Sequence, residues 1–389
     1  MTDKFNSMNT RVRNTVPGLF AALVWLGAAA LGGTFALGCS SPNDDGFAAL
    51  PPIPNMLAIA SGGQIKVYTG LLELALTGPA PTPAQTIIAP NVESVAFGTN
   101  GNLYFLANDG TLGSDATFFY CQMPPSGLPF PPCTAVGGPI VGGQWLAVNG
   151  SSVIFATSIT ATTGTIVSFP AAIGPPVVPT VVYTSGAKPF LYGGIAVDGS
   201  NSLYVTEQGS APVLAHRLFK CTAACQAAPG TQGDLTGSIT TPNPGSAPGG
   251  PLATSADGTT LFVGAANTGS APIPLTLPVV FVCTQGAGGL TCQADSATFP
   301  AVNGTTNPFV TAAGVAADST NNVYAAALLN DNGDTTTNLG PSFFGFVPAG
   351  AQFACSTTPA TCRVNQLPSV GTNTEPGLVP YGLAVSHIP

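Results

Sequence analysis

The sequence predicts an all-β protein, a six-bladed β-propeller, and three observations support this prediction. Charged residues make up only 6% of the chain and hydrophobic residues 45%, with 48 Gly and 38 Pro. A hydrophobic chain of low charge folds rather than staying disordered, and its many turn residues favour strands joined by short turns. One hairpin pattern recurs along the chain, and incomplete copies at its two ends complete each other.

The repeated unit is clearest at 194–206, where two apolar runs flank a polar turn. Such runs around Asp, Gly, Ser and Asn predict a β-hairpin. Six copies of the first run can be aligned, starting at Ser94, Trp145, Gly194, Pro251, Gly314 and Gly382. The second run follows five of them, and its central residues are 50, 50, 58 and 62 positions apart: Tyr104, Ile154, Tyr204, Phe262 and Tyr324. This period is typical of propeller blades with loop insertions.

The two ends of the repeat region set the expected number of blades. The first strands, near 56–59 and 65–68, have no inner strand before them, and the last run, 382–386, has no strand after it. We expect the last strand to pair in the N-terminal blade, because this closure removes exposed sheet edges. Residues 55–389 are therefore expected to form one six-bladed propeller domain. Tandem β-sandwiches are the alternative, since they also give regular strand signals.

Residues 1–38 have the pattern of an export signal peptide. A run of twenty uncharged residues ends at Gly38 and follows a segment with three basic residues, Lys4, Arg11 and Arg13. This order predicts a secretory signal, which starts at Met1 or at Met8. An uncleaved transmembrane anchor is the alternative, because about twenty apolar residues can span a bilayer. Residues 39–54 are expected to be a flexible tether.

The order Ala36-Leu37-Gly38-Cys39 resembles the end of a bacterial lipoprotein signal. The resemblance implies that Cys39 is diacylated and becomes the mature N-terminus, so the lipid anchor makes the membrane a partner. The family prefers its bulky residue at the position of Ala36, whereas here Leu37 is the larger one. Ser40, in place of Asp, implies sorting to the outer membrane of a Gram-negative bacterium. We therefore expect an exported protein that is lipid-anchored in the cell envelope.

The repeat, read as apolar-Ala-Val-Asp-x-x-Asn-apolar-Tyr-Val, resembles the NHL family and its gluconolactonase-like relatives. The second resemblance implies a metal-dependent hydrolase in which Glu93 holds one divalent cation such as calcium. Candidate further ligands lie at the ends of second strands: Asn108, Glu207 and Asp331. The family has an Asn before the inner run of later blades, where this chain has Tyr192 and Tyr381. Because calcium takes six to eight oxygen ligands, we expect no metal, no cofactor and no catalytic residue, with the hydrolase as the alternative.

Eight of the nine cysteines fall into four local pairs, and the ninth is Cys39. The pairs are Cys121/Cys133, Cys221/Cys225, Cys283/Cys292 and Cys355/Cys362. An even number in an exported chain predicts disulfide bonds, each joining the outer hairpin of one blade. A zinc site at Cys221, Cys225 and His216 is the alternative, but the sequence has no second Cys/His pair at a suitable spacing.

Charge and motifs make several function classes unlikely for this sequence. The net charge is −8, and only 5 of 8 basic but 15 of 16 acidic residues follow residue 38, which leaves no basic patch for nucleic acid. The sequence has no Gly-x-Ser-x-Gly elbow, phosphate loop or dinucleotide fingerprint, and its two histidines, His216 and His387, suggest no catalytic triad.

The loops of one propeller rim are the expected place for recognition. This rim is predicted to include the long segments 227–250 and 367–380. It is also predicted to carry Glu93, Asp109, Asp115, Lys188, Glu207, Asp331, Asp334, Glu375 and Tyr381. The sequence therefore favours a non-catalytic binding or scaffold protein for an unknown protein or small ligand. A gluconolactonase-like hydrolase and a purely structural envelope protein are the alternatives.

Overall fold

The computed structural model contains a compact unit, Ala49–Pro389, which is separate from a unit formed by residues 1–48. The described residues are 56–69 without 62, 82–108 without 99, 115–150 without 126, 154–159, 163–169, 179–185, 191–208, 216–235, 246–267 without 256–257, 280–294 without 287–288, 309–317, 323–329, 343–347 and 382–386. The predicted signal peptide, Cys39, the tether and Asp331 lie outside these residues. No helix among the described residues has the length and apolar character that a membrane crossing needs.

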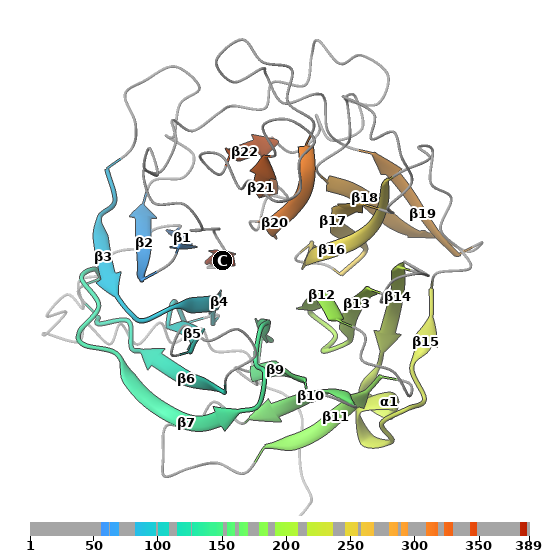
Figure 1. The fold of residues 1–389 in the computed structure, drawn as a ribbon, viewed down its shortest axis with the longest axis horizontal. Helices are drawn as coiled ribbons and strands as arrows, with labels where there is room; N and C mark the ends of the chain where they lie inside the picture. Colours follow the sequence, from blue (N-terminus) through green and yellow to red (C-terminus); the bar gives the residue numbers. More distant parts are fainter. Residues whose placement is uncertain are drawn as a thin grey trace, which may run out of the picture. The chain divides into compact units, whose positions relative to one another are not determined.

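The described strands form antiparallel sheets in chain order, and Figure 1 shows them around a common centre. The first sheet has β23 (Gly382–Val385), β1 (Met56–Ser61), β2 (Gln64–Thr69) and β3 (Gln85–Ile88). The second has β4 (Val92–Phe97), β5 (Leu103–Ala107), β6 (Ala116–Cys121) and β7 (Thr134–Ile140). The third has β8 (Leu146–Val148), β9 (Ile154–Ile159), β10 (Gly164–Phe169) and β11 (Thr180–Thr184).

The second half of the chain continues the pattern with one helix added. The fourth sheet has β12 (Leu191–Val197), β13 (Leu203–Gln208), β14 (His216–Cys221) and β15 (Gly233–Asp234), with α1 (Ala223–Ala227) between the last two. The fifth has β16 (Ser246–Thr254), β17 (Thr260–Asn267), β18 (Val280–Gly286) and β19 (Gly289–Ala294). The last has β20 (Phe309–Ala317), β21 (Val323–Leu329) and β22 (Phe343–Val347).

The propeller fold is confirmed, but the expectation of six blades is corrected. Among the described residues, five sheets have the full four strands and the sheet of β20, β21 and β22 has three. The structure therefore shows five complete blades rather than six. The reason lies in the chain after β22, because residues 348–381, from which a fourth strand would come, are outside the described residues.

The inner strands contact one another in a ring. Strand β23 contacts β4 and β20, β8 contacts β4 and β12, and β16 contacts β12 and β20. The expected closure is also present, because β23 pairs with β1 in the register Leu57↔Val385 to Ala60↔Gly382. Five of the inner strands carry the predicted apolar runs, and the last run completes the first sheet. A chain segment from the end of the sequence thus stands beside the first described strand.

The hydrophobic cores lie between neighbouring sheets rather than within one sheet. Ala96 and Tyr104 of the second sheet pack in one cluster with Leu146 and Phe169 of the third. A strand has two faces, and in a propeller each face is covered by an adjacent blade, so both sets of alternate side chains are buried. This geometry explains why apolar runs recur along the sequence. The corresponding residues Tyr104, Tyr204 and Tyr324 are all fully buried.

Three of the four predicted disulfide bonds are present. The bonds Cys121–Cys133 and Cys283–Cys292 join the third strand of a sheet to its fourth strand or the loop before it, with Cα–Cα distances of 4.3 and 4.0 Å. The bond Cys221–Cys225 instead joins the end of β14 to α1, with a Cα–Cα distance of 5.1 Å. Its four-residue spacing is about one helical turn, so the expectation that it joins two strands is wrong. The pair Cys355/Cys362 lies outside the described residues.

Candidate functional site

Two of the metal ligands that the hydrolase alternative requires lie together where the inner strand of the second sheet begins. Glu93 is half-buried on β4, and Asn108 follows β5 directly. The Asn108 amide Nδ2 donates a hydrogen bond to Glu93 Oε1. Burial raises the pKa of Glu93, and the bond from Asn108 opposes this rise without cancelling it. The pair therefore brings a carboxylate and a side-chain amide together at the start of β4.

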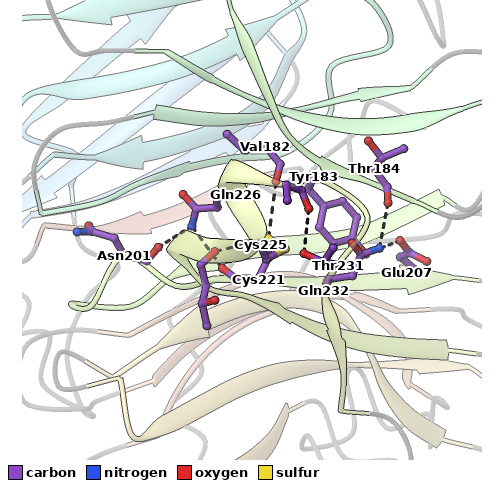
Figure 2. Close-up of a disulfide and its surroundings, with 12 residues drawn as sticks. Val182, Tyr183, Thr184, Asn201, Glu207, Cys221, Cys225, Gln226, Thr231 and Gln232 are labelled. Carbon is purple, nitrogen blue, oxygen red and sulfur yellow. Dashed lines mark hydrogen bonds between the residues drawn. A yellow bond between two sulfur atoms is a disulfide. The ribbon is translucent and has the colours of Figure 1, made fainter.

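Glu207 is not the exposed rim residue that the sequence suggests. It lies on β13 with only 1% of its surface exposed, and its Oε1 accepts a 2.7 Å hydrogen bond from Tyr183 Oη on β11 of the preceding sheet (Figure 2). Burial raises the pKa of Glu207, although the Tyr183 bond and the charge of Arg217 both lower it. This carboxylate therefore links two neighbouring sheets.

The described residues do not bring together the four ligands of the hydrolase alternative. Glu93 and Glu207 belong to different sheets, and Asp331 lies outside the described residues. Within the described part of the chain, no cluster of three or more His, Cys, Asp and Glu side chains can hold a metal ion. Two oxygen donors at Glu93 and Asn108 fall short of the six to eight that calcium takes. The zinc alternative is wrong, because Cys221 and Cys225 are bonded to each other.

A small cavity lies at the centre of the ring. Its volume is about 110 Å³, and five inner strands line it with triplets such as Val95–Phe97 and Ile195–Val197, while β23 contributes Ala384 and Val385. The middle residue of each triplet is a small one, for example Ala96, Ala196 or Ala316. Pockets for drug-sized ligands are typically about 300–1,000 Å³, so this cavity is too small for one.

A larger cavity, the side groove, lies between the first and second sheets. Its volume is about 450 Å³. One wall comes from the first sheet and the connection after it: Gln85, Ile87, Ile88, Ala89 and Pro90. The floor and the other wall come from the second sheet: Phe105, Phe119, Phe130, Pro131, Pro132 and Cys133. None of these described lining residues is charged, and the volume of the groove is in the range of small-molecule sites.

The walls of the side groove are fixed by specific contacts. Gln85 Nε2 donates to the Phe130 carbonyl at 3.0 Å, and the Phe130 N–H donates to Gln85 Oε1 at 2.7 Å. The Cys121–Cys133 disulfide holds the segment that carries Phe130. The rings of Phe105 and Phe119 stack with centroids 4.8 Å apart. The groove is therefore a built feature of the fold with an aromatic floor.

Sequence reasoning placed recognition on the loop-rich rim and missed the side groove. The groove combines a strand of one sheet with a loop of the next, and neither segment alone indicates a cavity. One signal was present in the sequence. Ile87 and Ile88 are adjacent on a strand, so their side chains point to opposite faces and one of them must leave the core. Ile88 is indeed 80% exposed.

Comparisons with known proteins find distant similarity only and show no family for this chain. No protein-family model and no curated protein matches the chain. A periplasmic gluconolactonase of Pseudomonas aeruginosa is 13% identical, with a TM-score of 0.45 over 86% of this chain and 99% of that one. A protein of Agrobacterium tumefaciens provisionally assigned as TolB is 11% identical, with a TM-score of 0.46 over the same shares. A protein from Lactobacillus plantarum is 13% identical, with a TM-score of 0.44 over 76% and 78%.

Proposed function

We propose that this chain is an exported, lipid-anchored β-propeller of the cell envelope that binds a ligand or partner and catalyses no reaction. The side groove is the observation that carries this proposal. It is the larger of the two cavities described above, and specific contacts hold its walls in place. Small-molecule sites are typically concave, mostly apolar and largely pre-formed, and the groove has these properties.

The groove favours a neutral, apolar ligand. Pro90, Pro131 and Pro132 have no N–H group, and both polar ends of the Gln85 amide are used by Phe130. These side chains would return few of the hydrogen bonds that a sugar or sugar lactone makes to water, and each buried polar group left unpaired costs free energy. An aliphatic or aromatic ligand has no hydrogen bonds to water to lose, and its burial contributes about 25 cal/mol of binding free energy for each Å² of apolar surface.

The binding proposal is tested with Nile red, a neutral dye that fluoresces in apolar surroundings. The compact unit Ala49–Pro389 contains every described sheet and the strand that closes it, so it is used without the anchor. Ile88→Asp places a charge at the groove and should abolish the signal. Val181→Asp is the matched control, because Val181 is 43% exposed on β11 and does not line the groove. Equal dye binding by both variants would contradict the proposal.

The lipid anchor is a proposal that rests on the Gly38-Cys39 junction. Wild-type protein should yield an N-terminal peptide that begins at Cys39 and carries the mass of a diacyl group. Cys39→Ala should lose this mass and should leave the membrane fraction, whereas Ser40→Ala should keep both. A mature chain that retains residues 1–38 would show the transmembrane alternative instead. Outer-membrane sorting is tested by separating the two membranes on a density gradient.

We also propose that the sheet of β20, β21 and β22 is a sixth blade. Its inner strand β20 contacts β16 and β23, as the other inner strands contact their neighbours. Amide hydrogen exchange across residues 348–381 tests this proposal. A fourth strand requires a short peptide in this range with slow exchange, and fast exchange throughout would contradict it.

The gluconolactonase-like hydrolase remains a second candidate because Glu93 and Asn108 meet at the start of β4. A divalent cation there would polarise a lactone carbonyl. We expect purified protein to carry no stoichiometric metal, and Glu93→Gln to leave the unfolding temperature nearly unchanged. One calcium or zinc ion per chain, lost together with lactone hydrolysis in Glu93→Gln, would establish the hydrolase. Asp115→Asn is the control, since Asp115 is an exposed carboxylate on the same predicted rim.

A further inference from the structure

Among the described strands, none pairs with the outer edge of β3, the outermost strand of the first sheet. Strand β3 pairs with β2 and with no other described strand. Its edge leads directly into the side groove, because Ile87 and Ile88 belong both to β3 and to the groove wall. An unpaired strand edge is a template onto which another extended chain can pair.

The register shows which backbone groups of β3 point outward. The Ala89 N–H donates to the Gly63 carbonyl at 3.0 Å, in line with the register Ile65↔Ile87 and Gln64↔Ile88. Hydrogen-bonded and non-bonded pairs alternate in an antiparallel ladder, so Gln85 and Ile87 bond to β2. The N–H and C=O groups of Thr86 and Ile88 therefore point away from β2, toward the open edge.

The side chains beside this edge offer apolar surface against which the side chains of an added strand can pack. Gln85 and Ile87 are partly buried and Thr86 and Ile88 are exposed, and the groove lining includes Gln85, Ile87 and Ile88. Ile88 is 80% exposed, against 43% for Val141 and Val181, the other large exposed hydrophobic residues among those described. Alternate residues of a strand added next to β3 would enter the groove over Phe119. The described lining residues carry no charge, so we expect the side chains that enter the groove to be apolar.

We propose that the first sheet is extended at β3 by an extended segment of a partner protein, whose alternate apolar side chains occupy the side groove. In this mode, backbone hydrogen bonds give affinity and pockets for alternate side chains give specificity. The segment pairs with Thr86 and Ile88 and packs its apolar side chains between Ile87 and the segment 130–132. This inference rests on the proposed binding function of the groove and names the class of its ligand.

The test uses a fluorescently labelled peptide that alternates valine or phenylalanine with threonine, added to the unit Ala49–Pro389 and followed by fluorescence anisotropy. We expect saturable binding. N-methylation of every second peptide nitrogen, on the side that faces β3, should weaken binding about tenfold or more, because each lost hydrogen bond leaves a group unpaired. A peptide with aspartate at the apolar positions should not bind.

Thr86→Pro is the decisive variant of the protein. Proline removes the N–H of residue 86, which points away from β2 and therefore makes no hydrogen bond within the first sheet. Proline is tolerated on edge strands at such positions. The variant should keep its circular dichroism spectrum and its Nile red signal but lose peptide binding, whereas Thr86→Val should keep all three. Peptide binding that survives both N-methylation and Thr86→Pro would overturn the inference.

Two further outcomes separate the inference from the proposal on which it rests. If Ile88→Asp abolishes Nile red binding but the peptide does not bind the wild type, strand addition is wrong and the binding function of the groove is retained. Absence of both signals would overturn both. A concentration-dependent dimer that Thr86→Pro dissociates would show that the edge pairs with a second copy of this chain, which also overturns the inference.

Discussion

The Ser386 hydroxyl oxygen accepts a 2.8 Å hydrogen bond from the backbone N–H of Met56, a residue 330 positions earlier in the chain. The Ser386 N–H in turn donates to the Met56 carbonyl at 2.9 Å. These bonds extend the pairing of β23 with β1 by one residue, and Ser386 is only 1% exposed. The closure of the first sheet therefore depends on a side chain as well as on the backbone ladder.

Ser386→Ala should lower the free energy of unfolding by about 1–3 kcal/mol, because it leaves the buried N–H of Met56 without its acceptor. Urea denaturation followed by intrinsic fluorescence measures this change. Ser158→Ala is the control, since the Ser158 hydroxyl bonds to the Val141 carbonyl at an exposed position. Equal midpoints for the two variants would show that the Ser386 side chain does not hold the closure.

Gly193→Ala should destabilise the contact between the fourth and fifth sheets. A Cβ atom at Gly193 would lie 2.0 Å from the Gly249 carbonyl oxygen, so the inner strands β12 and β16 would have to separate. Overpacking of this kind typically costs about 1–3 kcal/mol. The midpoint of thermal unfolding measures it. Gly150→Ala is the control, because nothing lies within 4 Å of a Cβ there.

The double variant Cys283→Ala/Cys292→Ala should lower stability by about 2–3 kcal/mol in the chain-entropy model for a short loop. The two residues are almost fully buried, so alanine avoids the cost of burying new polar groups. Chemical denaturation without reductant measures the difference in the free energy of unfolding.

Peptide mapping without reduction should also find the disulfide Cys355–Cys362. Free thiols at those two positions would contradict that pairing.

The free energy of unfolding should decrease as the pH rises, because Glu207 is buried. Burial raises its pKa in the folded state above the ordinary value of about 4.3. The folded state then holds a proton that the unfolded state has released, so the stabilisation is complete below about pH 4.3 and is lost as the pH rises through the raised pKa. Urea midpoints should therefore decrease across this range in the wild type and change less in Glu207→Gln. Parallel profiles for the two proteins would contradict this prediction.

The inner strands of the blades could be predicted from the sequence, and so could third strands such as β6 and β10, whereas most of the outermost strands could not. Inner strands such as Ile195–Val197 are covered on both faces by neighbouring sheets, so their burial appears as a continuous apolar run. Outermost strands such as β15 have one partner strand and exposed residues, and nothing in Gly233–Asp234 marks a strand.

The candidate sites escaped prediction for a different physical reason. The burial of Glu207 depends on Tyr183, which lies 24 positions earlier on another sheet. The side groove likewise needs Gln85 to meet Phe130, 45 positions later. A local pattern cannot report such distant contacts. The disulfides could be predicted because their partner cysteines are only 12, 4 and 9 positions apart in the sequence.

The pairing of β1 with β23 also constrains the order in which the molecule can fold. A growing chain exposes the edge of β1 from the start of the domain, and its partner is synthesised only when residues 382–385 are made. Contacts between such distant residues raise the contact order and slow folding, because the loop entropy is lost before the contact forms. The ring therefore remains open throughout synthesis.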